Sequence, residues 1–350
     1  MNTRIIMLDE SNLDTSVIEE AGKVIREGGL VAFPTETVYG LGANALSNDA
    51  VKKIFEAKGR PQDNPLIVHI SDIEEIKALV AEVPDIAERF MKRFWPGPMT
   101  VILPKSSIIP DATSAGLPSV GIRMPSNVIA RALITAAGVP IAAPSANISG
   151  RPSPTDVQRC IEDLDGRVDY ILGGEMSDIG LESTVIDCTV KPTCVLRPGG
   201  ITLEMLKEVD PDTYIDTAIM RKPGEDFKPK APGMKYRHYA PKAPVKIVQG
   251  DLKKTIAKIN EMVQNYIDGN KVVGIMATDE TKDFYPRGVV ISLGSRKNMI
   301  NISQSLFETL RSFDDKKVDV IISESFEEKG VGVAIMNRLN KSAAFDIIKV

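Results

Sequence analysis

The sequence is poor in the side chains that bind metals or carry redox chemistry. Its 350 residues include only three cysteines and two histidines. Their positions do not follow the spacing of any Cys/His zinc site; they are Cys160, Cys188, Cys194, His69 and His238. We therefore expect no zinc centre, and we interpret the cysteines as buried thiols.

Long apolar runs and an excess of positive charge are also missing. No stretch approaches the roughly eighteen apolar residues of a membrane span, and the N-terminus lacks the apolar segment of a secretory signal. The formal net charge is −4, which argues against indiscriminate binding to nucleic acid. We expect a cytoplasmic protein that makes no membrane contact.

The length and composition indicate a globular chain of about two domains. Hydrophobic residues make up 43% and charged residues 26%, as in ordinary globular proteins. We predict a first domain over 1–210 and a second over 244–350, joined by a linker over 211–243 that is rich in Lys, Arg, Pro and Gly. In the second domain, strands predicted at 245–248, 272–276, 289–293 and 318–323 alternate with helices at 252–267, 302–312 and 332–343. This alternation predicts a mostly parallel, Rossmann-like α/β sheet.

A polar loop follows the first buried strand of the chain. The apolar run 30–33 ends at Pro34, and the loop beyond it reads PTETVYGLG. It offers the hydroxyls of Thr35, Thr37 and Tyr39 and the carboxylate of Glu36. Because α/β sheets usually bind ligands at the carboxyl ends of their strands, this loop is a candidate pocket.

The glycines of this loop permit a second interpretation. Residues 40–45 read GLGANA, which fits the G-x-G-x-x-A pattern of dinucleotide-binding turns. In that motif the first glycine follows the strand directly and a helix opens at the last position. Here residues 34–39 intervene, so a nicotinamide cofactor is disfavoured.

Cations and one histidine occupy places that suit a ligand. A predicted helix over 49–57 leads into Lys58 and Arg60, and Asn64 follows in a stiff, proline-containing loop. Arg123 lies in the middle of a predicted strand, which is costly unless its guanidinium is paired or points into a pocket. His69, on the predicted strand 66–70, is either a hydrogen-bonded core residue or a functional one.

A second loop rich in hydroxyls follows the predicted strand 139–143. It includes Ser145 and Ser153, and Ser153 is either a helix cap or a phosphate contact at a helix start. Two further strands, 182–187 and 194–200, are predicted to pair through a turn at Pro192, and each carries a polar residue where an apolar one is usual. Those residues are Ser183 and Arg197.

These positions together indicate a polyanionic ligand. Lys58, Arg60, Arg123 and Arg197 have no matching set of acids in the pattern, and such a group of cations suits a nucleoside triphosphate. The sequence contains no G-x-x-x-x-G-K-[ST] loop and no kinase signature, which excludes those two ways of binding it.

Nine motifs, in this order, resemble those of the Sua5/YrdC family. They are FPTETVYGLG (33–42), KGR (58–60), NPLIVH (64–69), WPGPMT (95–100), IRMP (122–125), APSAN (143–147), ESTVID (182–187), LRPG (196–199) and APGMKYRHYAP (231–241). The resemblance covers essentially the whole chain and is to the long, two-domain Sua5 form.

The resemblance implies a twisted open α/β sheet with a concave basic face and threonylcarbamoyl-AMP synthase activity. L-Threonine, bicarbonate or CO₂ and ATP would give threonylcarbamoyl-AMP and pyrophosphate, with Mg²⁺ carried mainly by the ATP phosphates. The product would serve t6A modification of tRNAs, through downstream transferase proteins. The implied threonine-binding residues are Thr37, His69, Arg123 and Ser183. The implied nucleotide-binding residues are Arg60, Asn64, Ser119, Ser145, Ser153, Arg197 and Tyr236, with Lys58 as a further phosphate contact.

We expect Lys58 and Arg60 to stabilise charge on the phosphates, without any covalent nucleophile. Because Tyr236 lies far along the chain, its contact with ATP would require the linker to fold over the pocket as a lid. A non-enzymatic RNA-binding or tRNA-binding module is one alternative function. A related carbamoyltransferase is another, but it would carry further acylphosphatase-like or zinc-finger segments, and none is visible.

Overall fold

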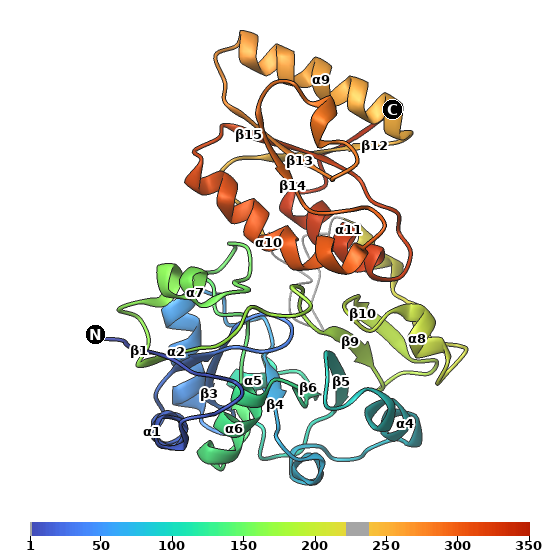
Figure 1. Cartoon of the computed structure of the whole chain (residues 1–350). Helices are drawn as coiled ribbons and strands as arrows, with labels where there is room; N and C mark the ends of the chain where they lie inside the picture. The colour runs from blue at the N-terminus through green and yellow to red at the C-terminus, as the bar shows by residue number, and fades with distance from the viewer. Residues whose placement is uncertain (1, 222–237) are drawn as a thin grey trace. The chain divides into compact units, whose positions relative to one another are not determined.

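The computed structural model describes residues 2–221 and 238–350, which form two compact units. Of the described residues, one unit contains 2–149 and 153–219, and the other contains 238–350 together with the short segments 150–152 and 220–221. Within the described residues, no helix is both long and apolar enough to cross a membrane. Figure 1 shows the elements of each unit.

The first unit contains one mixed sheet of eleven strands. In spatial order the strands are β1 (Arg4–Met7), β8 (Tyr170–Gly173), β2 (Val31–Phe33), β3 (Gly40–Asn44), β7 (Ile141–Ala142), β4 (Ile67–His69), β6 (Ser119–Arg123), β5 (Met99–Pro104), β9 (Thr184–Asp187), β10 (Cys194–Arg197) and β11 (Tyr214–Ile215). The predicted pairing of the strands around 184 and 196 is confirmed, because β9 and β10 are antiparallel.

Eight α-helices are described in this unit. They are α1 (Thr15–Arg26), α2 (Asn48–Lys58), α3 (Ile76–Leu79), α4 (Asp85–Phe94), α5 (Asp111–Ser114), α6 (Val128–Ala137), α7 (Val157–Leu164) and α8 (Leu203–Lys207). Short 3₁₀ turns are η1 (Ile73–Glu75) and η2 (Thr217–Met220), with η3 (Lys282–Phe284) in the second unit.

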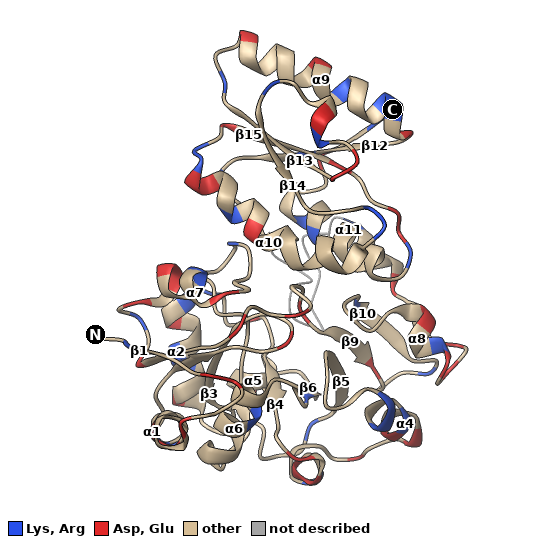
Figure 2. Ribbon diagram, in the orientation of Figure 1, with Lys and Arg blue, Asp and Glu red and all other residues tan. Residues whose placement is uncertain are grey.

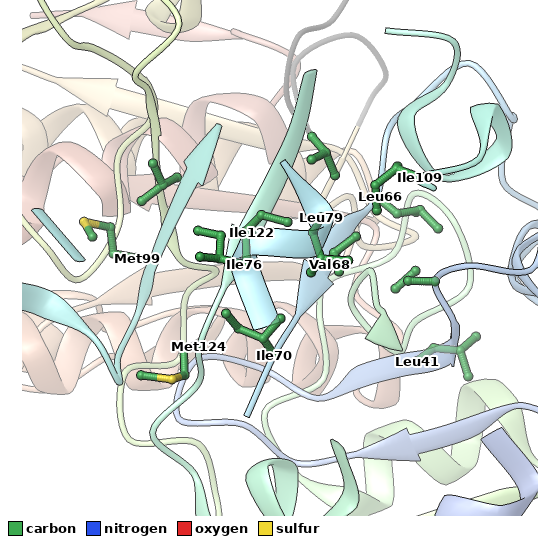
Figure 3. Close-up of a cluster of buried hydrophobic side chains, with 14 of the residues drawn as sticks. Leu41, Leu66, Val68, Ile70, Ile76, Leu79, Met99, Ile109, Ile122 and Met124 are labelled. Carbon is green, nitrogen blue, oxygen red and sulfur yellow. The ribbon is translucent and has the colours of Figure 1, made fainter. Parts of the chain in front are cut away.

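Two hydrophobic layers hold the first sheet. On β2, Val31 and Phe33 join the cluster that contains α1 and α6, whereas Ala32 between them joins the cluster that contains α2 and α4. This alternation is the two-residue period of a strand. The larger cluster includes the side chains of β4 and β6 in Figure 3. Each fully buried Ile, Leu or Phe stabilises the fold by about 1.5–3 kcal/mol.

Helix α1 shows how local sequence fixes an element. The carboxylate of Asp14 accepts a hydrogen bond from Ser16 N at 3.0 Å, which caps the first turn. Val17, Ile18, Ala21 and Ile25 are buried on its inner face. Gly22 faces α6 so closely that a Cβ would lie 2.7 Å from the backbone of Ala136. A larger residue at position 22 would separate the two helices.

The segment GLGANA is a strand and not a nucleotide-binding turn. β3 pairs antiparallel with β2 and with β7. A Cβ on Gly42 would lie 2.7 Å from Ile141 Cγ2 and 2.9 Å from Phe33 Cε1, so glycine is needed here for close packing. The dinucleotide interpretation is therefore excluded, and residues 34–39 are the connection between β2 and β3.

The second unit has a fully parallel sheet of five strands. The four predicted strands and their parallel arrangement are confirmed, whereas the strand at 347–349 was not predicted. Their order is β14 (Val289–Ser292), β13 (Val273–Ala277), β15 (Val320–Glu324), β12 (Val245–Gln249) and β16 (Ile347–Lys349). The helices are α9 (Leu252–Asp268), α10 (Met299–Asp315) and α11 (Val331–Ser342).

Candidate functional site

Strand register places the predicted polar residues in one row across the first sheet. His69 on β4 pairs with Arg123 on β6. On the neighbouring strands, Thr100 of β5 pairs with Val185 of β9, which pairs with Arg197 of β10. Residues in register on adjacent strands point to the same face. The row therefore brings together side chains that are up to 128 positions apart in the sequence (69 to 197).

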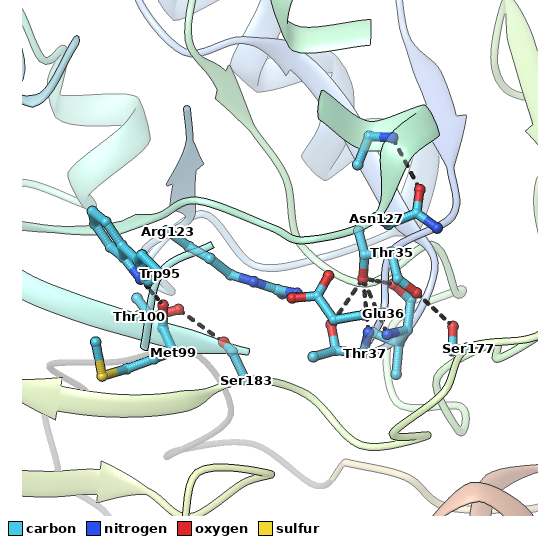
Figure 4. A network of polar contacts seen from close by, with 12 residues as sticks. Thr35, Glu36, Thr37, Trp95, Met99, Thr100, Arg123, Asn127, Ser177 and Ser183 are labelled. Atoms are coloured by element: carbon cyan, nitrogen blue, oxygen red, sulfur yellow. Dashed lines mark hydrogen bonds and ion pairs between the residues drawn. The ribbon is translucent and has the colours of Figure 1, made fainter. Parts of the chain in front are cut away.

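Arg123 forms a buried ion pair with Glu36 (Figure 4). Its Nη2 lies 2.8 Å from Glu36 Oε1, and the two side chains are only 5% and 6% exposed. The expectation that the cations lack matching acids is thus wrong for Arg123. The acid belongs to the loop between β2 and β3 and meets Arg123 only after folding.

This ion pair lacks the hydrogen bonds that usually accompany buried charges. Both carboxylate oxygens of Glu36, together with Arg123 Nε and Nη2, are buried and have no hydrogen-bond partner among the described residues. The 2.8 Å contact is therefore an ion pair of poor hydrogen-bond alignment. Buried pairs repay their desolvation only when further hydrogen bonds satisfy them. The hydrogen-bonding capacity that Glu36 and Arg123 leave unused is available to a polar ligand.

The loop that carries Glu36 is fixed by its own hydroxyls. Thr35 Oγ1 donates to Val38 O at 2.6 Å and lies 2.8 Å from Thr37 Oγ1. Because the Thr35 proton goes to Val38 O, Thr37 donates to Thr35. Ser177 Oγ also donates to Thr35 O at 2.9 Å. Thr37 itself is fully buried, which places the predicted threonine contact inside the protein.

His69 is a buried, neutral imidazole. Burial first, and then the positive charge of Arg123, lower its pKa from 6.5 to about 3. Its Nδ1 lies 3.2 Å from Ile67 O, and its ring meets the edge of Phe33 with centroids 6.4 Å apart. At neutral pH this side chain adds no charge to the site, so it can contact a ligand only as a neutral donor or acceptor.

Ser183 connects the row to β10. Arg197 donates through Nε to Ser183 O at 2.9 Å and through Nη2 to Ser183 Oγ at 3.0 Å. The same hydroxyl lies 2.8 Å from Thr100 Oγ1. The guanidinium of Arg197 is therefore hydrogen-bonded to Ser183. Its positive charge lies at the edge of the region that contains Arg123 and His69.

Ser119 lines a small hollow on the same face. The hollow is bounded by Pro65, Leu66, Ile67, Thr100, Ile102, Ser119, Gly121 and Val185. Arg60 lies at its border, where its Nη2 donates to Asn64 O and to Pro65 O, both at 3.3 Å. Asn64 is 1% exposed, and its Oδ1 has no hydrogen-bond partner in the described part of the chain. Ser119 therefore shares this hollow with Thr100, and Arg60 and Asn64 adjoin it at Pro65.

Lys58 is buried at the end of α2 and binds carbonyl groups. Its Nζ donates to Ser145 O and Asn147 O and lies 3.4 Å from Asn147 Oδ1. Ser145 Oγ in turn donates to Asn147 Oδ1 at 2.5 Å. The ammonium of Lys58 thus fixes the hydroxyl-rich loop, while Gly59, with a φ of 59°, turns the chain toward Arg60.

Ser153 also has an internal partner. Its hydroxyl donates to Glu182 Oε1 at 2.5 Å, and Glu182 directly precedes Ser183. The helix cap that Ser153 could have formed is supplied instead by Asp156, which accepts from Arg159 N at 3.0 Å. Tyr236, the remaining predicted nucleotide residue, lies outside the described residues, as does the linker segment 222–237.

Four residues that organise this region were not predicted as partners of the site residues, although Glu36 was named in the candidate pocket loop. Glu36, Thr100, Asn147 and Glu182 pair with Arg123, Ser183, Lys58 and Ser153 respectively. All four lie within the motifs or next to a predicted residue, and the sequence carries no other signal for them. Within residues 2–221 and 238–350, no three side chains of His, Cys, Asp or Glu gather in a way that could hold a metal ion.

Comparison with known proteins identifies the family. A family model described as telomere recombination (Sua5, YciO and YrdC) matches residues 23–199. A second, described as the C-terminal domain of threonylcarbamoyl-AMP synthase, matches residues 201–344. The chain belongs to the Sua5/YrdC family.

Similar proteins extend over the full length of the chain. Threonylcarbamoyl-AMP synthase of Bacillus subtilis is 48% identical over 342 residues, covering 97% of each protein. The enzyme of Pyrococcus abyssi is 48% identical over 346 residues, covering 99% of each. The crystal structure of P. abyssi Sua5 with L-threonine superposes with a TM-score of 0.94, covering 99% of this chain and all of that one.

Proposed function

We propose that this protein is a threonylcarbamoyl-AMP synthase. The observation that carries the proposal is 48% identity to enzymes of that name over nearly the whole chain, including both domains. L-Threonine, bicarbonate or CO₂ and ATP are converted into threonylcarbamoyl-AMP and pyrophosphate. The product supplies the threonylcarbamoyl group of t6A in tRNA through a separate transferase.

Threonine is placed against the row formed by β4 and β6. Its carboxylate binds the guanidinium of Arg123, which can present two parallel donors to such a group. Thr37, His69 and Ser183 surround it as neutral polar contacts. The support is the unfilled hydrogen-bonding capacity of Arg123 and the L-threonine complex of the P. abyssi relative.

ATP is placed beside threonine, toward Arg60 and the hollow at Ser119. Arg60 contributes positive charge and Asn64 a buried amide oxygen, while Arg197 lies across Ser183. Ser145 and Ser153 provide hydroxyls next to backbone segments fixed by Lys58 and Glu182. Lys58 acts on the phosphates mainly by holding this loop. Tyr236 belongs to the same set in our proposal.

The proposed reaction requires positioning more than acid–base catalysis. A carbamate oxygen of N-carboxythreonine forms a bond to the α-phosphorus of ATP, while the bond from that phosphorus to the pyrophosphate oxygen breaks. Charge on the phosphates is neutralised by Arg60. Mg²⁺ would be carried mainly by the ATP phosphates, where it would add positive charge to that of Arg60.

A nucleic-acid-binding module remains the second candidate from another class, but the charge pattern does not favour it. Helices α4, α7 and α8 each carry both positive and negative residues (Figure 2). A binding face for RNA would show a basic stripe.

The test is incubation of the protein with ATP, L-threonine and bicarbonate. We expect pyrophosphate only when all three are present. Omission of threonine or bicarbonate serves as the control, and pyrophosphate release that is independent of either one would contradict the proposal.

A further inference from the structure

Among the described residues, Glu36 is a charged group of the threonine region to which the function above gives no role. Its carboxylate is 6% exposed and touches Arg123, yet neither oxygen has a hydrogen-bond partner among the described residues. Arg123 Nε and Nη2 are likewise buried and have no hydrogen-bond partner among the described residues. Two opposite charges are therefore buried side by side, and both retain unused hydrogen-bonding capacity. Such groups call for a ligand or water that completes them.

Contacts made by its own loop also hold the Glu36 carboxylate in place. Thr35 and Thr37 on either side form hydroxyl contacts within the loop. The backbone carbonyl of Glu36 accepts a hydrogen bond from Ile179 N at 2.9 Å. A loop tied at three successive residues cannot swing its acid out to water at low cost. Glu36 is therefore preorganised beside Arg123.

The charges of this pair match those of a free amino acid. A zwitterion brings a carboxylate and an ammonium on neighbouring atoms, and it adds no net charge to a buried pair. Its carboxylate can bind Arg123, while its ammonium needs an acceptor nearby. Glu36 lies 2.8 Å from Arg123 and offers two oxygens that accept only, which is the acceptor an ammonium requires.

We propose that Glu36 binds the α-ammonium group of threonine and selects an amino acid over the corresponding hydroxy acid. The proposal rests on the proposed function, since it assumes that Arg123 receives the threonine carboxylate. On binding, the direct Glu36–Arg123 contact is replaced by two charge-assisted contacts to the ligand. A ligand with a carboxylate but no ammonium leaves Glu36 facing a second negative charge, so it binds poorly.

The experiment compares two ligands on two proteins by calorimetry, in the absence of ATP and bicarbonate. The ligands are L-threonine and 2,3-dihydroxybutanoate, which keeps the carboxylate and the β-hydroxyl but replaces the ammonium by a hydroxyl. We expect the wild-type chain to prefer threonine. In Glu36→Gln we expect threonine affinity to fall about 10- to 100-fold, as for loss of a charged hydrogen bond, while affinity for the hydroxy acid is unchanged or rises.

Equal effects of Glu36→Gln on both ligands would overturn the proposal, because Glu36 would then act only through Arg123. No effect on either ligand would overturn it as well. Glu82→Gln, which removes the same charge from an exposed position, is the matched control and should bind like wild type. Glu36→Asp keeps the charge on a shorter side chain and should recover part of the preference for threonine, which a purely steric effect would not produce.

Two further measurements distinguish a loss of threonine binding from a loss of folding and from a loss of activity. Urea unfolding of each variant shows whether lost binding is lost structure, and Glu36→Asp serves if Glu36→Gln is unstable. Wild-type protein that binds threonine but releases no pyrophosphate would refute the proposed function and leave the role of Glu36 standing. A folded Glu36→Gln variant with normal synthesis and an unchanged KM for threonine would refute the role of Glu36 alone.

Discussion

Replacing Arg123 by alanine separates the two ligands that the site is proposed to hold. The guanidinium is 5% exposed, forms an ion pair with Glu36 at 2.8 Å and lies in register with His69. Arg60 and Asn64, by contrast, lie toward the hollow at Ser119, where Arg60 donates to the carbonyl groups of Asn64 and Pro65. The substitution should therefore affect threonine and leave ATP nearly untouched.

The expected magnitudes follow from the burial of this pair. Loss of a charged hydrogen bond to the threonine carboxylate costs about 1.5–3 kcal/mol, which is roughly a 10- to 150-fold weaker Kd. Removing one partner of a buried ion pair lowers the free energy of unfolding by about 3–5 kcal/mol, because Glu36 is left charged and unpaired. The Kd for ATP should change by less than about threefold, a difference under 1 kcal/mol.

Calorimetry with each ligand, together with urea unfolding, measures these three quantities. Arg131→Ala is the control, since Arg131 is exposed on α6 and donates only a 3.4 Å bond to Ser71 O. The double variant Arg123→Ala with Glu36→Ala removes the isolated charge and should recover part of the stability without recovering threonine affinity. Equal losses for threonine and ATP would refute the assignment of Arg123 to the amino acid.

Three further outcomes test individual residues. Burial lowers the pKa of His69 to about 3, so below pH 6.5 the unfolded state takes up a proton that the native state does not. The free energy of unfolding should therefore fall by about 2 kcal/mol between pH 6.5 and about pH 5. In urea unfolding, a folded His69→Gln variant should lose less stability over that interval. Lys58→Met removes the donor to the Ser145 loop and should raise KM for ATP while lowering stability by about 1–3 kcal/mol, whereas a change in kcat alone would contradict a positioning role. Ser183→Ala leaves Thr100 without its 2.8 Å partner and should raise KM for threonine about tenfold, the effect of one hydrogen bond; an unchanged KM would remove Ser183 from the threonine site.

Much of the fold was predictable because its elements carry clear periodic patterns. Helix α1 has its buried apolar residues on one face and Asp14 as its cap, and both patterns are present in the local sequence. The alternating strands and helices of the second domain correctly predicted a parallel sheet. These features depend on local sequence, which a single chain displays.

The strand β3 was not predictable in the same way. Its residues GLGAN lack the β-branched and aromatic side chains that mark strands. Glycine is present because Phe33 and Ile141 pack against the backbone, and Ile141 is distant in sequence. Tertiary packing thus decides the conformation of this segment.

The same limit applies to the site. The sequence pointed to Arg123 as a strand arginine in need of a partner, but it did not reveal Glu36 as that partner. The two residues are 87 positions apart (36 to 123), and their contact depends on the order of β2, β3, β7, β4 and β6 in the sheet. Thr100 and Ser183 meet for the same reason, through the parallel pairing of β5 with β9.

The most direct test of the whole account is mass spectrometry of the nucleotide product formed with ¹³C-bicarbonate. We predict an adenylate that contains threonine and one ¹³C atom, in amounts equal to the pyrophosphate released. An adenylate without the labelled carbon, or pyrophosphate released with no threonine-containing nucleotide, would contradict the claim that this site joins an amino acid, a one-carbon unit and AMP.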